Sequence, residues 1–129
     1  MAYSSVNPTY IPGLSAGQSL ASSQYLVVKK ASTARQVIVV AATTDVACGV
    51  VQNDPAANEA ALVQTMGIAI CIAGVNDLAV NENVGYDSTG RVVDHTTDNR
   101  MSIGRVLDTS TAVGDQVRVM LYGGGSQRY

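Results

Sequence analysis

Short runs of β-branched residues, separated by turn residues, fill the chain from residue 25 to residue 122, and this pattern limits the fold more than any other feature. Val, Ile and Thr favour extended backbone, and Gly, Asn, Asp and Pro mark turns. No segment has the 3.6-residue apolar period of an amphipathic helix. The pattern predicts strands at 25–29, 36–40, 48–52, 61–73, 84–87, 91–93, 101–107 and 116–122. Many short strands at close intervals indicate an all-β fold, a small barrel or a sandwich.

The longest apolar segment, residues 61–73, predicts the central strand of the sheet. Alternation places isoleucines at positions 68, 70 and 72 on one face and small residues at positions 69, 71 and 73 on the other. Both faces are apolar, so we expect this strand to be buried on both sides. Gly67 in its middle predicts a bulge or a sharp bend, of the kind that closes a small barrel.

Two connections have readable turn chemistry. Residues 53–61 could form one helical turn, with Asp54 as the N-cap and Pro55 at the first helical position, or a hairpin loop. We favour the loop, because extended patterning resumes on both sides. Residues 84–93 predict a hairpin in which Asp87 opens the turn and Gly90 takes a positive φ.

The first 24 residues differ from the rest in composition. They hold two of the three prolines and six serines, and they carry no charged side chain. Pro8 and Pro12 stiffen this segment as extended chain, which could add a strand to the sheet edge of a partner. The alternative is a disordered terminus. We predict an extended arm (1–24), a β-barrel domain (25–122) and a flexible C-terminal tail (123–129). The predicted binding residues of the arm are Tyr3, Val6, Pro8, Tyr10, Ile11, Pro12 and Leu14.

Composition narrows the class of partner. Hydrophobic residues make up 47% of the 129 residues but aromatic residues only 5%, without Trp or Phe. An aliphatic core buries less area per residue, which favours oligomerisation as a further source of burial. Charged residues are 14% and the net charge is −2, so a surface covered by protein partners is expected. The scattered Lys and Arg residues argue against a nucleic-acid partner. No signal peptide or membrane-spanning segment is recognisable, so we expect synthesis in a cytoplasm and no membrane partner.

No constellation of residues predicts catalysis, a metal or a cofactor. His95 beside Asp94 could act as a general base, but no nucleophile-elbow motif accompanies it, and an exposed loop residue is the simpler interpretation. The aspartates at positions 87, 94 and 98 lack calcium-loop spacing. The glycines at 123–125 lead to no helix and do not form a phosphate loop. Cys48 and Cys71 are predicted to be two free thiols rather than a disulfide. We therefore expect a binding protein, not an enzyme.

Several short segments, taken in their order, carry a resemblance to a known family. The segments are ACGVVQND at 47–54, AGV at 73–75, YDSTGRV at 86–92, IGRVL at 103–107 and GDQVRV at 114–119. In this order they resemble the small capsid decoration (cement) proteins of tailed phages, of the lambda head-decoration type. The resemblance covers residues 25–122.

The resemblance implies a compact barrel of the β-tulip kind and a structural role without enzymatic activity. It implies a homotrimer on local three-fold positions of an expanded phage head, bound to the major capsid protein on the outer surface of the virion. The arm would then lie on capsid subunits. The alternative is a glycan- or receptor-binding head-surface protein, in which an exposed Tyr86 or Tyr122 stacks on sugar. The absence of Trp argues against this alternative.

Overall fold

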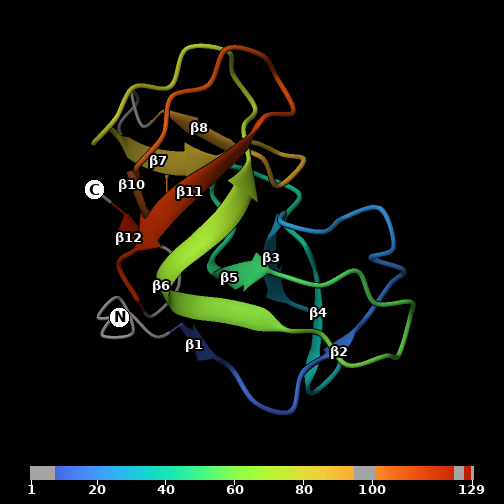
Figure 1. The fold of residues 1–129 in the computed structure, drawn as a ribbon. Coiled ribbons are helices and arrows are strands. Elements are labelled where there is room, and N and C mark those ends of the chain that lie inside the picture. The colour runs from blue at the N-terminus through green and yellow to red at the C-terminus, as the bar shows by residue number, and fades with distance from the viewer. Residues whose placement is uncertain (1–7, 95–100, 124–126, 129) are drawn as a thin grey trace, which may run out of the picture.

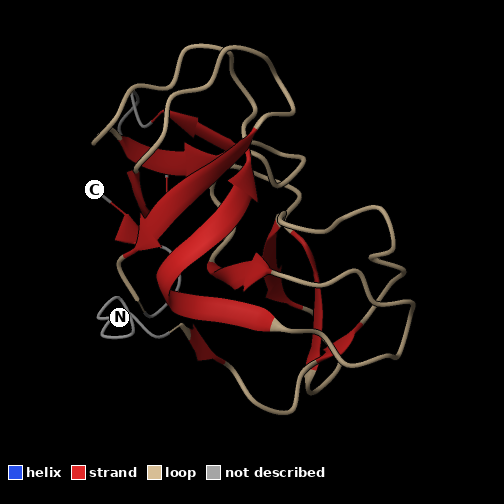
Figure 2. Cartoon of the chain, viewed as in Figure 1, coloured by secondary structure: helices blue, strands red, loops and turns tan. Residues whose placement is uncertain are grey.

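The computed structural model describes residues 8–94, 101–123 and 127–128. They form an all-β fold, as predicted, and contain no helix (Figures 1 and 2). The twelve strands are β1 (Thr9–Tyr10), β2 (Ser15–Ala16), β3 (Val27–Lys30), β4 (Gln36–Val39), β5 (Ala47–Val51), β6 (Val63–Ile72), β7 (Asn83–Tyr86), β8 (Val92–Asp94), β9 (Met101–Ser102), β10 (Gly104–Val106), β11 (Gln116–Leu121) and β12 (Gln127–Arg128).

Ten of these strands form one sheet that does not close. Its order is β2-β4-β3-β5-β6-β11-β10-β7-β8, with β1 paired to β6, and β9 pairs with β12 in a separate two-stranded sheet. Only β2 and β4 pair in parallel; the other pairs between the described strands are antiparallel. Within the described residues no ladder joins β2 to β8. The predicted all-β class is therefore confirmed, but the predicted closure of the sheet into a barrel is wrong.

Strand β6 is shared by two halves of the sheet. Its first residues pair with β5 and β1, and residues 67–72 pair with β11. Gly67 has a φ of 93°, in the left-handed region that side chains disfavour. The strand bends between the two halves (Figure 1). The predicted bend at Gly67 is confirmed, but it does not close a barrel. It joins two halves of the sheet, which we call lobes: strands β1 to β5 lie on one side of β6, and β7, β8, β10 and β11 lie on the other.

Two apolar cores lie on opposite faces of the inner strands. In β3, Val27 belongs to one core and Val28 to the other, and in β5 the same holds for Val50 and Val51. This division follows from the two-residue period of a strand. The larger core surrounds the buried ring of Tyr86, and the smaller one is almost entirely aliphatic. β3 and β5 therefore each stabilise both cores.

The N-terminal segment belongs to the smaller core, which corrects the predicted boundary at residue 24. Leu14 and Leu20 are buried there, with Leu20 fully enclosed. The backbone is fixed as well: the N–H of Ala16 donates to the carbonyl of Glu59 at 2.9 Å, and that of Leu20 to the carbonyl of Pro55 at 2.8 Å. A small core without Phe or Trp needs these leucines, so residues 8–24 are part of the folded domain.

The predicted C-terminal tail also departs from expectation. Gly123 turns the chain with a φ of 93°, and the backbone of residues 127–128 forms β12 against β9. The predicted strand at 101–107 is divided at Ile103, because β9 pairs with β12 whereas β10 pairs with β7 and β11. The division lets one segment serve two sheets.

Both predicted turns are confirmed. β7 and β8 form an antiparallel hairpin, and Gly90 has a φ of 86°. One carboxylate oxygen of Asp87 accepts hydrogen bonds from the N–H and hydroxyl of Thr89 and from the N–H of Arg91. Residues 53–61 form a loop without helix, held by the side chain of Asn53, which binds the carbonyl of Ala60 and the N–H of Leu62.

Candidate interaction surface

The seven predicted binding residues of the arm differ in their exposure to solvent. Tyr3 and Val6 lie outside the described residues. Pro8 and Pro12 are exposed, the side chain of Tyr10 is 37% exposed, Ile11 is half-buried and Leu14 is buried. Leu14 therefore serves the protein's own core, and the exposed members of the set within the described residues are Pro8, Tyr10 and Pro12.

The strand-adding capacity predicted for this segment is used inside the molecule. Thr9 pairs with Met66 and Tyr10 with Gln64, and the N–H of Ile11 donates to the carbonyl of Val63 at 3.0 Å. The segment adds an edge strand to its own β6, as extended segments add to partner sheets in other proteins. The outward side chains of this edge remain available for a partner.

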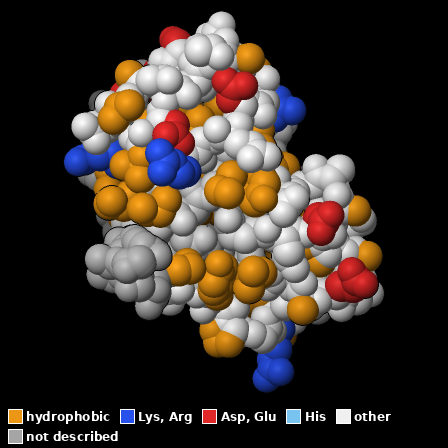
Figure 3. Space-filling view, viewed as in Figure 1, with side chains coloured by type: hydrophobic (Ala, Val, Ile, Leu, Met, Phe, Trp, Pro, Cys, Tyr) orange, Lys and Arg blue, Asp and Glu red, His pale blue; other side chains and the backbone are white. Residues whose placement is uncertain are grey.

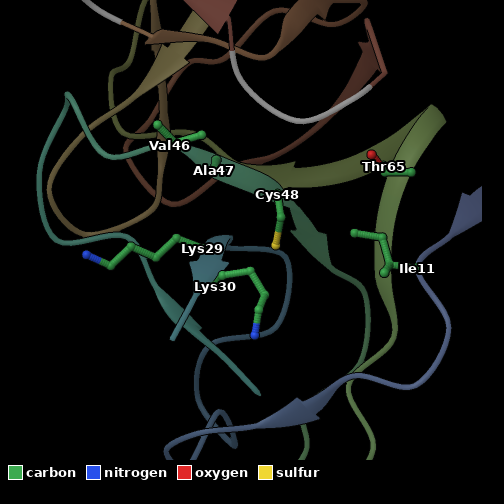
Figure 4. Close-up of a pocket in the computed structure, with 7 residues that line it drawn as sticks. All are labelled: Ile11, Lys29, Lys30, Val46, Ala47, Cys48 and Thr65. Atoms are coloured by element: carbon green, nitrogen blue, oxygen red, sulfur yellow. The ribbon is translucent and has the colours of Figure 1, made fainter. Parts of the chain in front are cut away.

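An open groove of about 620 Å³ lies between β5 and the β1–β6 edge (Figure 4). Val46 and Cys48 form one wall, Thr65 and Ile11 form the other, and Lys29 and Lys30 of β3 lie beside Cys48. The groove exists because β5 pairs with β6 only at Val50 and Val51, and the strands separate before that point. It is a mixed surface, largely apolar in its walls apart from Thr65 and cationic at one side.

The two lysines of the groove differ in whether a carboxylate neutralises their charge. The ammonium of Lys29 forms an ion pair with Asp45 at 2.8 Å. The hydrogen bond from Lys29, followed by that from the N–H of Ala41, lowers the pKa of the Asp45 carboxyl below its usual value. Lys30 instead donates to the carbonyls of Thr33 at 3.2 Å and Gln36 at 3.0 Å. No carboxylate among the described residues pairs with Lys30.

The two cysteines are free thiols, as predicted, in different environments. Cys71 is fully buried in the larger core, and desolvation raises the pKa of its thiol to about 12. Cys48 is half-buried on the groove wall, where partial desolvation raises the pKa of its thiol. Cys48 is therefore the thiol that solvent can reach.

An apolar face of the central strands is exposed, which corrects the expectation that β6 is buried on both sides. Met66, Ile68 and Met120 are 49%, 37% and 45% exposed. Ile68 of β6 lies opposite Met120 of β11, which lies opposite Arg105 of β10. Hydrophobic side chains gather on the face that carries β6 and β11 (Figure 3). Alternation identified the two faces of β6, but it could not show which one the fold covers.

Most of the remaining candidate residues lie outside the described part of the chain or are engaged in a turn. His95 and Asp98 lie outside the described residues, and Asp87 is engaged in its turn. No three potential metal ligands cluster among the residues that the structure describes. No helix in this part of the chain is long and apolar enough to cross a membrane.

The structure corrects the expected exposure of Tyr86, one of the two tyrosines predicted to stack on sugar. The ring of Tyr86 is fully buried, and its hydroxyl donates to the backbone carbonyl of Asp45. Tyr122 is half-buried, with its hydroxyl on the side-chain oxygen of Asn83. Stacking on a sugar needs an exposed aromatic face, and Tyr86 has none.

Comparison with known proteins found a likeness of fold. No family model matches the sequence, and no curated protein matches it. The head fiber gp8.5 N base of bacteriophage phi29 is similar in structure, with a TM-score of 0.63 and 13% sequence identity. The match covers 95% of this chain and 98% of that chain. The two chains share a fold.

The extent of this match bears on the domain boundary. Coverage of 95% is more than residues 25–122 alone could supply. The shared fold therefore includes part of the N-terminal segment or of the C-terminus, in agreement with the burial of Leu14 and Leu20.

Sequence reasoning missed the groove. The adjacent Lys29 and Lys30 are the one local signal for it, since the chain has no other adjacent pair of basic residues. The groove also needs Ile11 and Thr65, which reach it only because β1 and β6 pair beside β5. No spacing in the sequence reveals that arrangement.

Proposed function

We propose that this protein is a structural protein of a phage head surface, which binds the major capsid protein as a homotrimer and stabilises the expanded head. The observation that supports this most is the fold shared with a phage head fiber base over 95% of the chain. The short sequence segments that, in their order, resemble phage decoration proteins independently support a location on a phage head. Both lines support the proposed location on a phage head.

The physical properties of the chain suit that role. A protein that binds only the expanded lattice stabilises it by its binding free energy, and many copies together give high avidity. Such a task needs a rigid body and outward contacts, not a reactive residue. We therefore propose a non-enzymatic role, with the exposed side chains of residues 8–12 as part of the capsid contact.

The test uses purified protein and expanded heads that lack it. We expect co-sedimentation and, in cryo-EM maps, density at the local three-fold positions. Tyr10→Ser should weaken binding, whereas the control Val113→Ser, at a valine that is 55% exposed in a distant loop, should not. A truncation of residues 1–24 is a poor test, because it also removes Leu14 and Leu20 from the core.

Each outcome is informative. Absence of head binding by the intact protein overturns the proposed function. Normal binding by Tyr10→Ser and by a variant that lacks residues 2–7 overturns the role of the N-terminal segment alone. Monomers both in solution and on the head overturn the trimer.

A further inference from the structure

The groove lies at a fork between two strands. On its β3 side, β5 is paired from Ala47 to Val50, but on its β6 side the pairing covers only Val50 and Val51. The strands meet closely at Gly49, where a Cβ atom would lie 2.4 Å from the carbonyl oxygen of Gln64. Before this contact they diverge. Among the described residues, no strand pairs with Cys48 on the groove side.

The walls of the fork are suited to an extended chain. Val46 is 70% exposed, and it lines the groove together with Ile11 and Cys48. The volume of about 620 Å³ lies within the range of roughly 300–1,000 Å³ for ligand sites, although the groove is open along its length. An open groove beside a strand edge accommodates a segment that passes through it, with alternate side chains directed toward and away from the wall.

The charge of the groove selects an acidic occupant. Asp45 neutralises Lys29, so Lys30 contributes the one uncompensated charge among the described residues of the groove. An ammonium group has three donors, and the carbonyls of Thr33 and Gln36 accept two of the three from Lys30. These bonds hold the ammonium in place and leave one N–H for a ligand. A carboxylate would form a charge-assisted hydrogen bond with it.

We propose that this groove binds an extended, carboxylate-bearing segment of the capsid protein, which lies along β5 with its apolar side chains on Val46 and Ile11 and an Asp or Glu at Lys30. The inference rests on the proposed function and names the chemistry of the partner. A small anion alone would leave the apolar walls unused. A purely apolar segment would leave the charge of Lys30 unpaired.

Cys48 provides a reporter within the groove. Because Cys71 is fully buried, a small maleimide should modify Cys48 selectively in the intact protein. We expect this modification to slow at least about tenfold on expanded heads, since a bound segment covers the thiol, as buried thiols react little. A benzophenone attached at Cys48 should crosslink to a capsid-protein peptide that contains Asp or Glu, identified by mass spectrometry.

Charge variants test Lys30 separately. Lys30→Gln should weaken head binding by about tenfold, because one charge-assisted hydrogen bond is lost. Lys30→Arg should retain most of the affinity. The matched control Arg105→Gln removes an exposed cation from β10 in the other lobe and should bind normally. Thermal unfolding of each variant shows that the fold is intact.

The outcomes separate the two proposals. If heads bind the protein while Cys48 stays reactive and Lys30→Gln binds normally, the groove proposal is overturned and the proposed function stands. Absence of any binding to heads overturns both. A crosslink to a second copy of this chain, or to a capsid segment without carboxylates, overturns the assigned occupant.

Discussion

Single aspartates hold loops of this protein in place by accepting several hydrogen bonds each. Asp45 is such a residue, beside the groove. One of its carboxylate oxygens accepts hydrogen bonds from Lys29 and from the N–H groups of Ala41 and Ala42, at 2.8, 2.8 and 3.0 Å. Its backbone carbonyl accepts the hydroxyl of Tyr86. The residue therefore connects the loop before β5 to β3 and to the larger core.

This arrangement predicts a pH-dependent stability. The folded state lowers the pKa of Asp45, so its contribution is fully present above the unfolded pKa of about 3.9 and is lost as the pH falls through the folded value. Asp45→Asn should lower the free energy of unfolding by about 1–2 kcal/mol at pH 7, because one ion pair and two N–H bonds weaken. The difference from wild type should shrink toward zero at the lowest pH at which both proteins fold.

Denaturant titrations at pH 7 and at acid pH measure this difference. Asp54→Asn is the control, because Asp54 is exposed and outside any described ion pair. If the difference in the free energy of unfolding between wild type and variant stayed constant across the pH range, Asp45 would stabilise the fold through its packing rather than through its charge.

At the scale of the element, the N-terminal segment is the clearest case in which tertiary packing, rather than local sequence, determines that a segment is folded. Leu20→Ala should lower the free energy of unfolding by about 2–4 kcal/mol, because it opens a cavity in the smaller core. Leu62→Ala removes the same atoms from a side chain that is 42% exposed and should cost much less. Equal costs in urea titrations would contradict the assignment of residues 8–24 to the folded domain.

The strands were largely predictable and their partners were not. β11 and the β7–β8 hairpin lie within a residue or two of their predicted bounds, because alternation and the Asp87–Gly90 turn act locally. Leu20 is buried in the same core as Val28 and Val37, and these residues come together only in the folded sheet. The groove was beyond prediction for the same reason.

A repeated turn sequence is a further local signal in the chain. Ala-x-Asn-Glu occurs at 56–59 and at 79–82. In both copies the Glu carboxylate accepts the N–H of the alanine, at 2.8 and 2.7 Å. Asn58 and Asn81 have φ values of 68° and 74°, which asparagine tolerates better than most residues. The repeat marks the turns that precede β6 and β7.

For the whole molecule, the shared strands predict cooperative unfolding. β3 and β5 contribute to both cores and β6 to both halves of the sheet, so neither lobe can lose its packing alone. We expect one transition, with exposure of the Cys71 thiol in the larger core coinciding with loss of the β-sheet circular dichroism signal. Leu20→Ala, although in the smaller core, should shift both curves equally. Two separated transitions would show independent lobes.

The bend in β6 also constrains how such a protein can change over generations. A substitution at Gly67 would disturb both lobes at once, because only glycine readily adopts its φ of 93°. Exposed positions such as Val80 and Val113 carry no such constraint from burial. A chain built in this way can keep its shape with few side chains in common, and the phi29 head fiber base shares this fold at 13% identity.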